Sequence, residues 1–344
     1  MIVSPTIGNI EKLLVDFFQN NSYSKIIVLC DENTLEYCYP IIENIFSTKP
    51  ELIQIKSGEE YKNIETCVFI WEKLTQYQTD RNALLINLGG GVIGDMGGFC
   101  ASTYKRGIDF INIPTTLLAQ VDAGLGGKLG IDFKLLKNHI GLFKEPVAIL
   151  TDPLFLNTLP ERQIKSGFAE IIKHSLIKSK TQWDDLLSKK YNEYDWSEII
   201  PKSIEIKKDI VSRDFKETGE RKLLNFGHTI GHAIETLLIS QGKDIFHGEA
   251  VAAGMIMESF IALKAGKLSS GVYNEIVSFI DSYYERLFWL EENEEEILKL
   301  IKQDKKNKGN EILMTLLEDI GISKWDFAID DKIILDSMHN YLNN

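Results

Sequence analysis

Short apolar runs alternate with amphipathic stretches through the first half of the chain. The runs at 25–30, 52–55, 83–88, 108–113 and 147–150 are rich in Ile, Leu and Val and end at polar residues or glycines, as buried strands do. Helical spacing of apolar positions follows the first run as far as Ile45, and the second from Glu59 to about Tyr77. This alternation predicts an α/β domain whose mainly parallel sheet is covered on both faces.

After Asp152 the strand pattern stops and helical patterns fill most of the chain. Pro160 suits the first turn of a helix that begins near Glu161. Helices are predicted at about 161–178, 182–190, 196–214, 220–240, 247–266, 270–285 and 293–306. The segment 312–317 fits either a late strand or a buried helical turn. We therefore expect an α/β domain over residues 1–155 and a mainly α-helical domain over residues 156–344.

Composition narrows the class of protein. The 344 residues are 44% hydrophobic and 26% charged, as in soluble globular proteins, and the formal charge of -12 argues against a nucleic-acid binder. A phosphorylated ligand would need a local basic pocket. No segment resembles a signal peptide or is long enough to span a bilayer, so we expect a cytoplasmic protein without a membrane partner. Four cysteines suit buried thiols in a reducing compartment: Cys30, Cys38, Cys67 and Cys100.

Three histidines in the helical half form a candidate metal site. His228 and His232 are four residues apart within a segment of helical apolar spacing, so they project from one side of a helix. His247 follows a polar loop and opens the next helical run. Neutral imidazoles in this arrangement can hold a divalent ion, most plausibly zinc. Two structural histidines on a helix would give the same spacing, so both interpretations stay open.

A glycine-rich loop after the third predicted strand is a candidate nucleotide site. The sequence GGGVIG at 89–94 fits G-x-G-x-x-G between a strand and a helix, where backbone N–H groups can approach a pyrophosphate. The acidic residue usual about 20 positions later is not evident. Asp31 and the pair Glu59 and Lys62 are alternative ribose or adenine contacts. A plain tight turn is the competing interpretation.

Polar side chains interleave with glycines from Thr103 to Asn138. The glycines and Lys128 in Gly126-Gly127-Lys128 suit backbone and ammonium contacts to an anion, which we favour over a solvated loop. The polar residues of this stretch include Arg106, Thr115, Thr116, Gln120, Asp122, Lys128, Lys137 and Asn138.

Glu170, Lys173 and His174 share one face of a predicted helix. Glu170 has apolar neighbours, where a carboxylate needs a partner such as a metal ion or Lys173. An intrahelical Glu–Lys pair on the surface is the alternative.

A second polar group precedes the histidines. Arg221, Asn225, His228 and His232 follow one another at spacings of 4, 3 and 4, which predicts one polar stripe on a single helix. Such a stripe is untypical of a solvent-exposed helix face and typical of residues that line a binding site.

Together these motifs resemble the 3-dehydroquinate synthase family of sugar phosphate cyclases. The resemblance covers nearly the whole chain through long segments: GGGVIGDMGGFCASTYKRGIDFINIPTTLLAQVD, GGKLGID, LKNHIG, LPERQIKSGFAEIIKH, GERKLLNFGHTIGHAIE and HGEAVAAGM. It implies a Rossmann-like N-terminal domain that binds NAD and a helical C-terminal domain that binds a divalent metal, zinc or cobalt. It also implies a homodimer.

The implied reaction converts 3-deoxy-D-arabino-heptulosonate 7-phosphate into 3-dehydroquinate and phosphate, a step of the shikimate pathway, with NAD regenerated in each turnover. The implied metal ligands are Glu170, His228 and His247, which makes His232 a substrate contact. Arg106 is implied to reach the phosphate in a partner subunit. The other implied substrate contacts are Asp122, Lys128, Asn138, Lys173, Lys207, Glu217, Arg221, Asn225 and Lys306, with Lys305 as an alternative to the last.

The implied NAD contacts are Asp31, Glu59, Lys62, Gly90, Gly91, Asp95, Thr115, Thr116, Leu118, Lys128 and Lys137. The chain departs from the family beside them. It has Ala123-Gly124 and Leu129 where the family usually has hydroxyl residues, and Asp132 where Asn is common. It keeps Arg221 and Asn225, which cyclases of other sugar phosphates tend to lose.

Three other functions compete with this one. Another sugar phosphate cyclase would act on sedoheptulose 7-phosphate or glucose 6-phosphate. A metal-dependent alcohol or glycerol dehydrogenase, which shares the fold, would accumulate NADH and release no phosphate. A binding protein without activity would have lost the metal ligands, whereas Glu170, His228 and His247 are all present.

Overall fold

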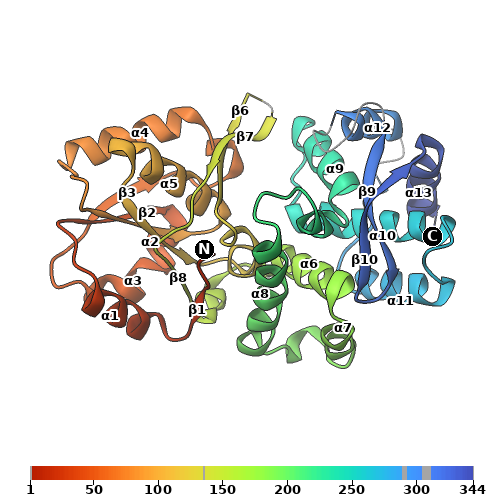
Figure 1. Cartoon of the computed structure of the whole chain (residues 1–344), viewed down its shortest axis with the longest axis horizontal. Coiled ribbons are helices and arrows are strands. Elements are labelled where there is room, and N and C mark those ends of the chain that lie inside the picture. Colours follow the sequence, from red (N-terminus) through yellow and green to blue (C-terminus); the bar gives the residue numbers. More distant parts are fainter. Residues whose placement is uncertain (1, 135, 289–292, 304–310, 344) are drawn as a thin grey trace. The chain divides into compact units, whose positions relative to one another are not determined.

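The computed structural model describes residues 2–134, 136–288, 293–303 and 311–343. Contacts divide the chain into two compact units, Met1–Pro160 and Glu161–Asn344, and Figure 1 traces both. The division follows Pro160, whereas the sequence pattern placed it between residues 155 and 156. The expected contacts Lys305 and Lys306 lie outside the described residues.

A six-stranded parallel sheet forms the centre of the first unit, in the order β1-β8-β5-β4-β2-β3. Its strands are β1 (Thr6–Ile7), β2 (Ile26–Asp31), β3 (Glu51–Ile55), β4 (Leu84–Gly89), β5 (Asp109–Pro114) and β8 (Ala148–Thr151). The helices and helical turns are α1 (Ile10–Asn20), α2 (Glu32–Tyr37), α3 (Tyr39–Ile42), η1 (Glu43–Ile45), η2 (Glu59–Tyr61), α4 (Ile64–Gln76), α5 (Gly91–Thr103), η3 (Tyr104–Arg106), η4 (Ala119–Ala123) and η5 (Pro153–Thr158). The α/β fold and the five predicted strands are confirmed. Strand β1 is too short to give a period.

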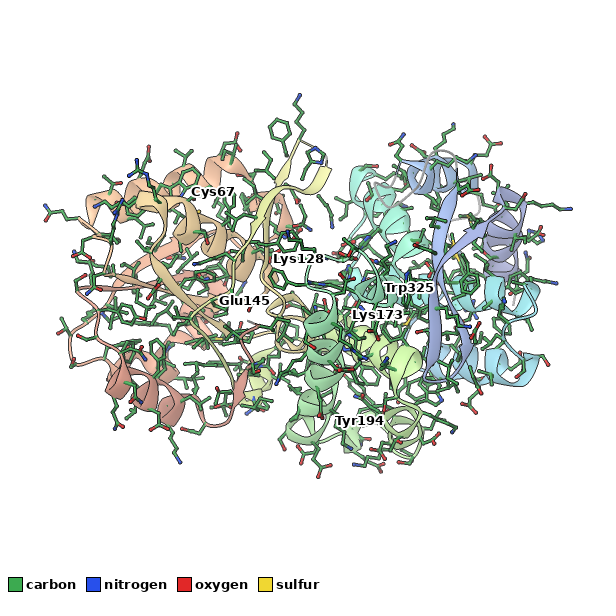
Figure 2. All side chains as sticks on the ribbon, viewed as in Figure 1. Cys67, Lys128, Glu145, Lys173, Tyr194 and Trp325 are labelled. Atoms are coloured by element: carbon green, nitrogen blue, oxygen red, sulfur yellow. The ribbon has the colours of Figure 1, made fainter. Side chains whose placement is uncertain are left out.

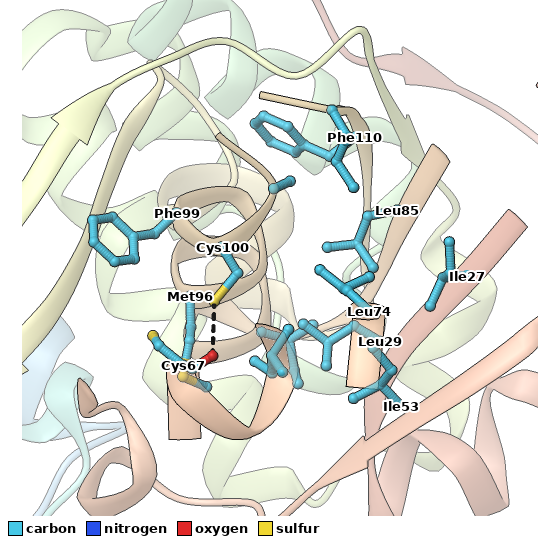
Figure 3. Packing of buried hydrophobic residues seen from close by; sticks show 14 of the residues in the cluster. Ile27, Leu29, Ile53, Cys67, Leu74, Leu85, Met96, Phe99, Cys100 and Phe110 are labelled. Carbon is cyan, nitrogen blue, oxygen red and sulfur yellow. Dashed lines mark hydrogen bonds between the residues drawn. The ribbon is translucent and has the colours of Figure 1, made fainter. Parts of the chain in front are cut away.

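The strands are apolar on both faces because each face packs against helices. Leu85 belongs to one buried cluster, whereas its neighbours Leu84 and Ile86 belong to the other. Figure 3 shows the first cluster, in which Met96 and Phe99 of α5 are drawn with side chains of the sheet. All four cysteines are free and buried.

The strand order fixes where a ligand can bind. From β2 the chain passes to β3 on one side, and β4 then lies on the other side of β2. The topological switch point is therefore between β2 and β4, and ligands of such sheets bind beyond the carboxyl ends of the strands there. Asp31 ends β2, and Gly89 ends β4.

The polar, glycine-rich stretch contains an antiparallel hairpin that the pattern did not predict, β6 (Lys128–Phe133) and β7 (Leu136–Phe143). Gly130 and Gly141 face each other in this hairpin. A Cβ atom at Gly141 would lie 2.2 Å from the Leu129 carbonyl oxygen, so the glycine permits the close approach of the strands. The same glycines hide the usual alternation of strand residues.

The second unit is mainly helical. Its helices and turns are α6 (Glu161–Lys178), α7 (Lys180–Leu187), η6 (Tyr191–Glu193), α8 (Trp196–Arg213), η7 (Glu220–Asn225), α9 (His228–Ser240), α10 (His247–Lys264), α11 (Ser270–Asp281), α12 (Glu294–Lys302) and α13 (Asp331–Asn343). An antiparallel hairpin, β9 (Ile312–Asp319) and β10 (Ile322–Ile329), completes it. Of the two alternatives for 312–317, the structure thus confirms the strand. Among the described residues, no helix is long and apolar enough to cross a membrane.

The single helix expected over 220–240 is wrong. Gly227 has a φ of 77° and separates the 3-10 turn η7 from α9. The buried carboxylate of Glu258, on α10, then accepts hydrogen bonds from the N–H groups of Gly227 at 2.6 Å and Ile230 at 3.1 Å. Because a side chain on another helix satisfies these N–H groups, the local sequence carries no cap signal.

Helix α10 packs closely against α6 and against α9 at glycines. A Cβ atom at Gly231 would lie 2.9 Å from the Ala250 carbonyl oxygen, and one at Gly254 would lie 2.0 Å from the Gly227 carbonyl oxygen. One at Gly248 would lie 2.3 Å from the Ser166 carbonyl oxygen. Backbone therefore lies against backbone where α10 meets each of the other two helices.

Candidate functional site

A carboxylate and two imidazoles converge in the helical unit. Glu170 Oε1 lies 3.4 Å from His228 Nε2 and 3.4 Å from His247 Nε2. Glu170 is fully buried, and within the described residues its Oε1 has no hydrogen-bond partner. Two ligand atoms on a tetrahedral zinc ion, each at about 2.0–2.1 Å from it, are about 3.4 Å apart. Both distances from Glu170 therefore fit those between ligands of one divalent ion, which Glu170, His228 and His247 would hold.

The far atoms of the same three side chains are held by other groups. Glu170 Oε2 accepts a hydrogen bond from Lys173, which is itself buried and is labelled in Figure 2. His228 Nδ1 lies 3.1 Å from the Phe226 carbonyl oxygen, and His247 Nδ1 lies 3.3 Å from Glu235 Oε2. With a proton on each Nδ1, both Nε2 atoms present a lone pair, as metal ligands do.

Charges around this cluster separate the pKa values of its members. Burial disfavours the Glu170 carboxylate, yet Lys173 and His228 hold its pKa well below the usual range. Burial and the charge of Lys173 lower the pKa of His228 to about 4. Burial would also lower the pKa of His247, but Glu235 and Glu170 raise it to about 10. The cluster thus keeps Glu170 ionised and His228 neutral, which are the forms that bind metal, whereas His247 carries a second proton at neutral pH that an incoming ion would displace from Nε2.

His232 lies beside the cluster. Its ring centroid is 4.9 Å from that of His228 and 5.7 Å from that of His247. One ligand atom from each of the three histidines lies within 4.8 Å of the others. His228 and His232 do project from one side of a helix, as predicted.

Arg162 holds the segment that leads to His247. Its guanidinium contacts both carboxylate oxygens of Glu249, at 2.6 and 2.9 Å, and the Asp244 carboxylate at 2.5 Å. It also lies over the Phe246 ring, 4.5 Å from the centroid. The first turn of α6 is therefore tied to both sides of His247 by a bidentate ion pair, a second carboxylate and an aromatic face.

The segment between α8 and α9 carries the other expected contacts of the helical unit. Asn225 Nδ2 donates to Glu217 Oε1 at 2.8 Å. Arg221 is buried and donates to the Phe215 carbonyl oxygen at 2.7 Å. Lys207 on α8 is buried as well. Arg221 and Asn225 lie on η7 and not on the helix of the histidines, which corrects the single polar stripe expected from their spacing.

Asp214 organises this segment. Its carboxylate accepts hydrogen bonds from the N–H groups of Thr218 at 3.0 Å, Gly219 at 2.7 Å and Arg221 at 3.1 Å. Burial opposes ionisation, but these hydrogen bonds lower the pKa of Asp214. Glu217, inside the loop, has a φ of 61°, which a non-glycine residue adopts only when its surroundings impose it.

The glycine loop of the first unit lines a small pocket at the carboxyl end of β4. The pocket residues are Asn87, Gly89, Gly90, Gly91, Gly94, Asn112, Pro114, Ala119, Ala123 and Gly124. A Cβ atom at Gly90 would lie 3.1 Å from Thr116 Cγ2, and one at Gly91 would lie 3.1 Å from Ala123 Cβ. Helix α5 begins at Gly91. The loop therefore has the bare backbone and the helix N-terminus that suit a dinucleotide phosphate.

Lys62 links two other expected cofactor contacts to one expected substrate contact. Its buried Nζ lies 2.7 Å from Asp95 Oδ2, 3.7 Å from Glu59 Oε1 and 2.7 Å from Asn138 Oδ1. Burial would lower the pKa of Lys62, but Asp95 and Glu59 raise it. Asp132 accepts a hydrogen bond from the Asn138 N–H at 2.7 Å. Asn138 has a φ of 49°, so the two contacts fix an unusual conformation.

The remaining expected residues of the first unit are placed as follows. Asp31 caps α2 by accepting a hydrogen bond from the Thr34 N–H at 2.8 Å. Asp122 lies in the π-helical turn η4, a form that often marks a functional site. Arg106 is exposed, with a φ of 69°. Thr115 is buried, Thr116, Leu118 and Lys137 are partly exposed, and Lys128, labelled in Figure 2, is exposed.

Five residues near these sites were not predicted from the sequence pattern. Glu235 is seven residues after His228, which puts it on the histidine face of α9, so helical spacing could have found it. Asn87 and Asn112, bonded to each other at 2.9 Å, are polar residues inside apolar strands and gave a readable signal. Asp214 and Arg162 gave no such signal, because only the folded chain brings them to their hydrogen-bond partners.

Comparison with known proteins gives the class and the family. Among solved structures, 2-deoxy-scyllo-inosose synthase complexed with carbaglucose-6-phosphate, NAD+ and Co2+ is similar, with a TM-score of 0.84 and 23% identity over 99% of both chains. The chain therefore has the fold of the sugar phosphate cyclases.

The family follows from the sequence. Family profiles described as 3-dehydroquinate synthase N-terminal and C-terminal match residues 52–166 and 167–307. The 3-dehydroquinate synthase of Parabacteroides distasonis is 40% identical over 95% of this chain and 94% of its own length. That of Clostridium beijerinckii is 43% identical over 87% of each. The chain belongs to the 3-dehydroquinate synthase family.

Proposed function

We propose that this chain converts 3-deoxy-D-arabino-heptulosonate 7-phosphate into 3-dehydroquinate and phosphate, with catalytic NAD and a divalent metal ion. The observation that carries the proposal is the meeting of Glu170, His228 and His247 at ligand spacing in a member of this family. The reaction is an elimination of phosphate followed by carbocycle closure, and it leaves the redox state of NAD unchanged over a turnover.

Glu170, His228 and His247 would hold the ion, zinc or cobalt. One carboxylate and two imidazoles are a ligand set found in catalytic zinc sites. A bound divalent ion lowers the pKa of a hydroxyl that it contacts, which favours oxidation of that carbon. Lys173 keeps Glu170 anionic by binding the oxygen that faces away from the histidines. His232 would contact the substrate.

Backbone of the glycine loop would receive the NAD pyrophosphate at the start of α5, beyond the switch point of the sheet. Bound there, NAD would supply reversible hydride transfer, so no external oxidant would be consumed. The expected NAD contacts of this unit include Asp31 at the end of β2 and Asp95 on α5. They also include Glu59 on η2 and Lys62 directly after it. The remaining expected NAD contacts are Thr115, Thr116 and Leu118, which follow β5, and Lys128 and Lys137 on the β6–β7 hairpin.

The substrate carries a carboxylate and a phosphate, and the buried cations of the helical unit are suited to both. Lys173, Lys207 and Arg221 lie on α6, α8 and η7 and are all buried. A chain with a formal charge of -12 needs such local cations to bind a dianion. The planar guanidinium of Arg221 favours the carboxylate, which it can bind with two hydrogen bonds. Glu217 and Asn225 would position substrate hydroxyls.

The test is phosphate release by the purified protein with this substrate, NAD and zinc, while absorbance reports NADH. We expect phosphate without accumulation of NADH, and loss of the reaction on chelation. Release from sedoheptulose 7-phosphate or glucose 6-phosphate instead would make it another cyclase. Lasting NADH without phosphate would make it a simple dehydrogenase.

A homodimer is part of the same proposal, because Arg106 would act on the phosphate in a partner subunit. Arg106 follows α5 on an exposed turn, where a second subunit could reach it. Mixing Arg106→Ala with His247→Ala protein, after exchange of subunits, should restore part of the activity that each variant lacks. A lack of any restoration in exchanged dimers would place Arg106 within its own subunit's site.

A further inference from the structure

The C-terminal hairpin β9–β10 lies beyond residue 307, where the match to the family profile ends. We propose that this hairpin is a positioning device for the substrate: Thr315 and Asp326 hold Lys222 and thereby fix Arg221 and Asn225. The inference rests on the proposed function of these two residues as substrate contacts. No part of the hairpin is proposed to touch the substrate itself.

Both ends of Lys222 are bound by the hairpin. Its Nζ lies 2.8 Å from Asp326 Oδ1 and 2.7 Å from Asp326 Oδ2, in a bidentate ion pair. Its backbone carbonyl oxygen accepts a hydrogen bond from the Thr315 hydroxyl at 2.8 Å. Thr315 is buried on β9, and Asp326 is on β10, so each strand of the hairpin supplies one contact.

The backbone at Asp326 is shaped for this contact. Asp326 has a φ of 61°, a left-handed conformation that costs a non-glycine residue free energy. It falls where the register of the two strands shifts, between Lys324 and Phe327. Bulges of this kind redirect a side chain out of the alternation of a strand. Here the redirected side chain is the one that binds Lys222.

Two hydrogen bonds attach the hairpin to α6, the helix that carries Glu170 and Lys173. The N–H of Gly321, in the hairpin turn, donates to the Leu176 carbonyl oxygen at 2.7 Å. The Ser323 hydroxyl donates to the Ile177 carbonyl oxygen at 3.0 Å. These contacts satisfy carbonyl groups in the last turn of α6. The hairpin therefore connects the end of α6 to the 3-10 turn η7.

Fixing Lys222 matters because η7 is short and irregular. A 3-10 turn has poorer hydrogen-bond geometry than an α-helix and occurs only in short pieces, so contacts from outside contribute more to fixing it. Asp214 binds the start of the segment through backbone N–H groups, and the hairpin binds its middle at Lys222. Arg221 directly precedes the bound residue, and Asn225 follows it within η7. Substrate contacts held to a fraction of an ångström need such support.

The experiment compares Asp326→Asn and Thr315→Val with the matched control Lys324→Ala. Asn tolerates the left-handed backbone, so Asp326→Asn removes mainly the charge. Lys324 forms an exposed ion pair with Glu318 at 3.0 Å across the same two strands. We expect KM for the sugar phosphate to rise about tenfold, or roughly 1.4 kcal/mol, in both test variants and to stay unchanged in the control. Zinc and NAD affinities should stay constant in all three.

A second measurement does not depend on turnover. Amide exchange at Lys222 and Phe226, whose N–H groups bond within the segment at 3.0 and 3.1 Å, should quicken in the two test variants and not in the control. In a double-mutant cycle, Lys222→Met combined with Asp326→Asn should be no worse than either change alone. Unchanged exchange and KM in both test variants would overturn the proposal. Absence of phosphate release by the wild-type protein would instead overturn the proposed function, while the exchange result would still decide the role of the hairpin.

Discussion

The carboxylate of Glu235 lies 3.3 Å from Nδ1 of His247, and so connects α9 to the first residue of α10. His228 stands on α9 two turns before Glu235. Helix α9 therefore supplies one proposed metal ligand itself and orients another through a buried carboxylate. Pairs of this kind fix the tautomer and the ring orientation of a ligating histidine.

Changing Glu235 to Ala should weaken zinc binding by about 10- to 100-fold, because His247 loses the acceptor that orients its ring. Glu235→Gln should lose less, since its amide oxygen can still accept the Nδ1 proton. The measurement is zinc affinity in competition with a chromogenic chelator. Glu285→Gln, an exposed change in the same unit, is the control. Equal zinc affinity in the wild-type and Glu235→Ala proteins would show that Glu235 does not orient the ligand.

His247→Ala and His232→Ala should separate ligand from substrate contact. We expect His247→Ala to lose both the metal and turnover while NAD binding persists, because a ligand atom is gone. His232→Ala should keep stoichiometric metal and lose turnover. Metal analysis of the purified variants, with NAD titrated by fluorescence, gives both results. A metal-free His232→Ala protein would assign that histidine to the ion instead.

Asp214→Asn should unfold more easily than wild type by about 1–3 kcal/mol at neutral pH, since three backbone N–H groups lose a charged acceptor. The pKa of Asp214 is lowered on folding, so its contribution is present above the unfolded pKa of about 3.9 and is lost as pH falls below it. Denaturant titrations from pH 8 to acid should show the difference constant down to about pH 5 and shrinking below pH 4. Asp336→Asn, an exposed change on α13, should show no such convergence.

Gly227→Ala should be far more damaging than Gly242→Ala. Both glycines have positive φ, 77° and 69°. A Cβ atom at Gly242 meets nothing within 4 Å, so that variant shows the backbone strain alone, about 1–2 kcal/mol. At Gly227 the Cβ atom would lie 2.5 Å from Met255 Cγ and 3.0 Å from the Val251 carbonyl oxygen. Thermal unfolding compares the two variants, and similar melting temperatures would contradict the tight contact of α9 with α10.

The sheet of the first unit could be predicted because each strand carries its own apolar run. The β6–β7 hairpin could not, since its pairing depends on Gly130 facing Gly141, and glycines give no hydrophobic period. The break before α9 was missed for a different reason. The N–H groups at Gly227 and Ile230 are satisfied by Glu258, which is far away in the sequence.

The candidate site divides in the same way. Glu170, His228 and His247 could be named from motifs, and the structure brings their side chains together, although their role as ligands is still a prediction. Residues that act through others left little trace. Arg162 and Asp326 look like ordinary surface charges in the sequence, because only the folded chain brings Glu249 and Lys222 to them.

The glycines at the junction of α6, α9 and α10 have a consequence for how this site can change over time. Gly248 abuts Ser166, and Gly231 abuts Ala250, so the distances among the helices bearing Glu170, His228 and His247 are set by peptide atoms. A side chain at either glycine would meet backbone atoms, which have no alternative rotamer to adopt, so the helices themselves would have to move apart. Gly231 and Gly248 are therefore the positions at which inherited changes are least compatible with keeping the three donor atoms together.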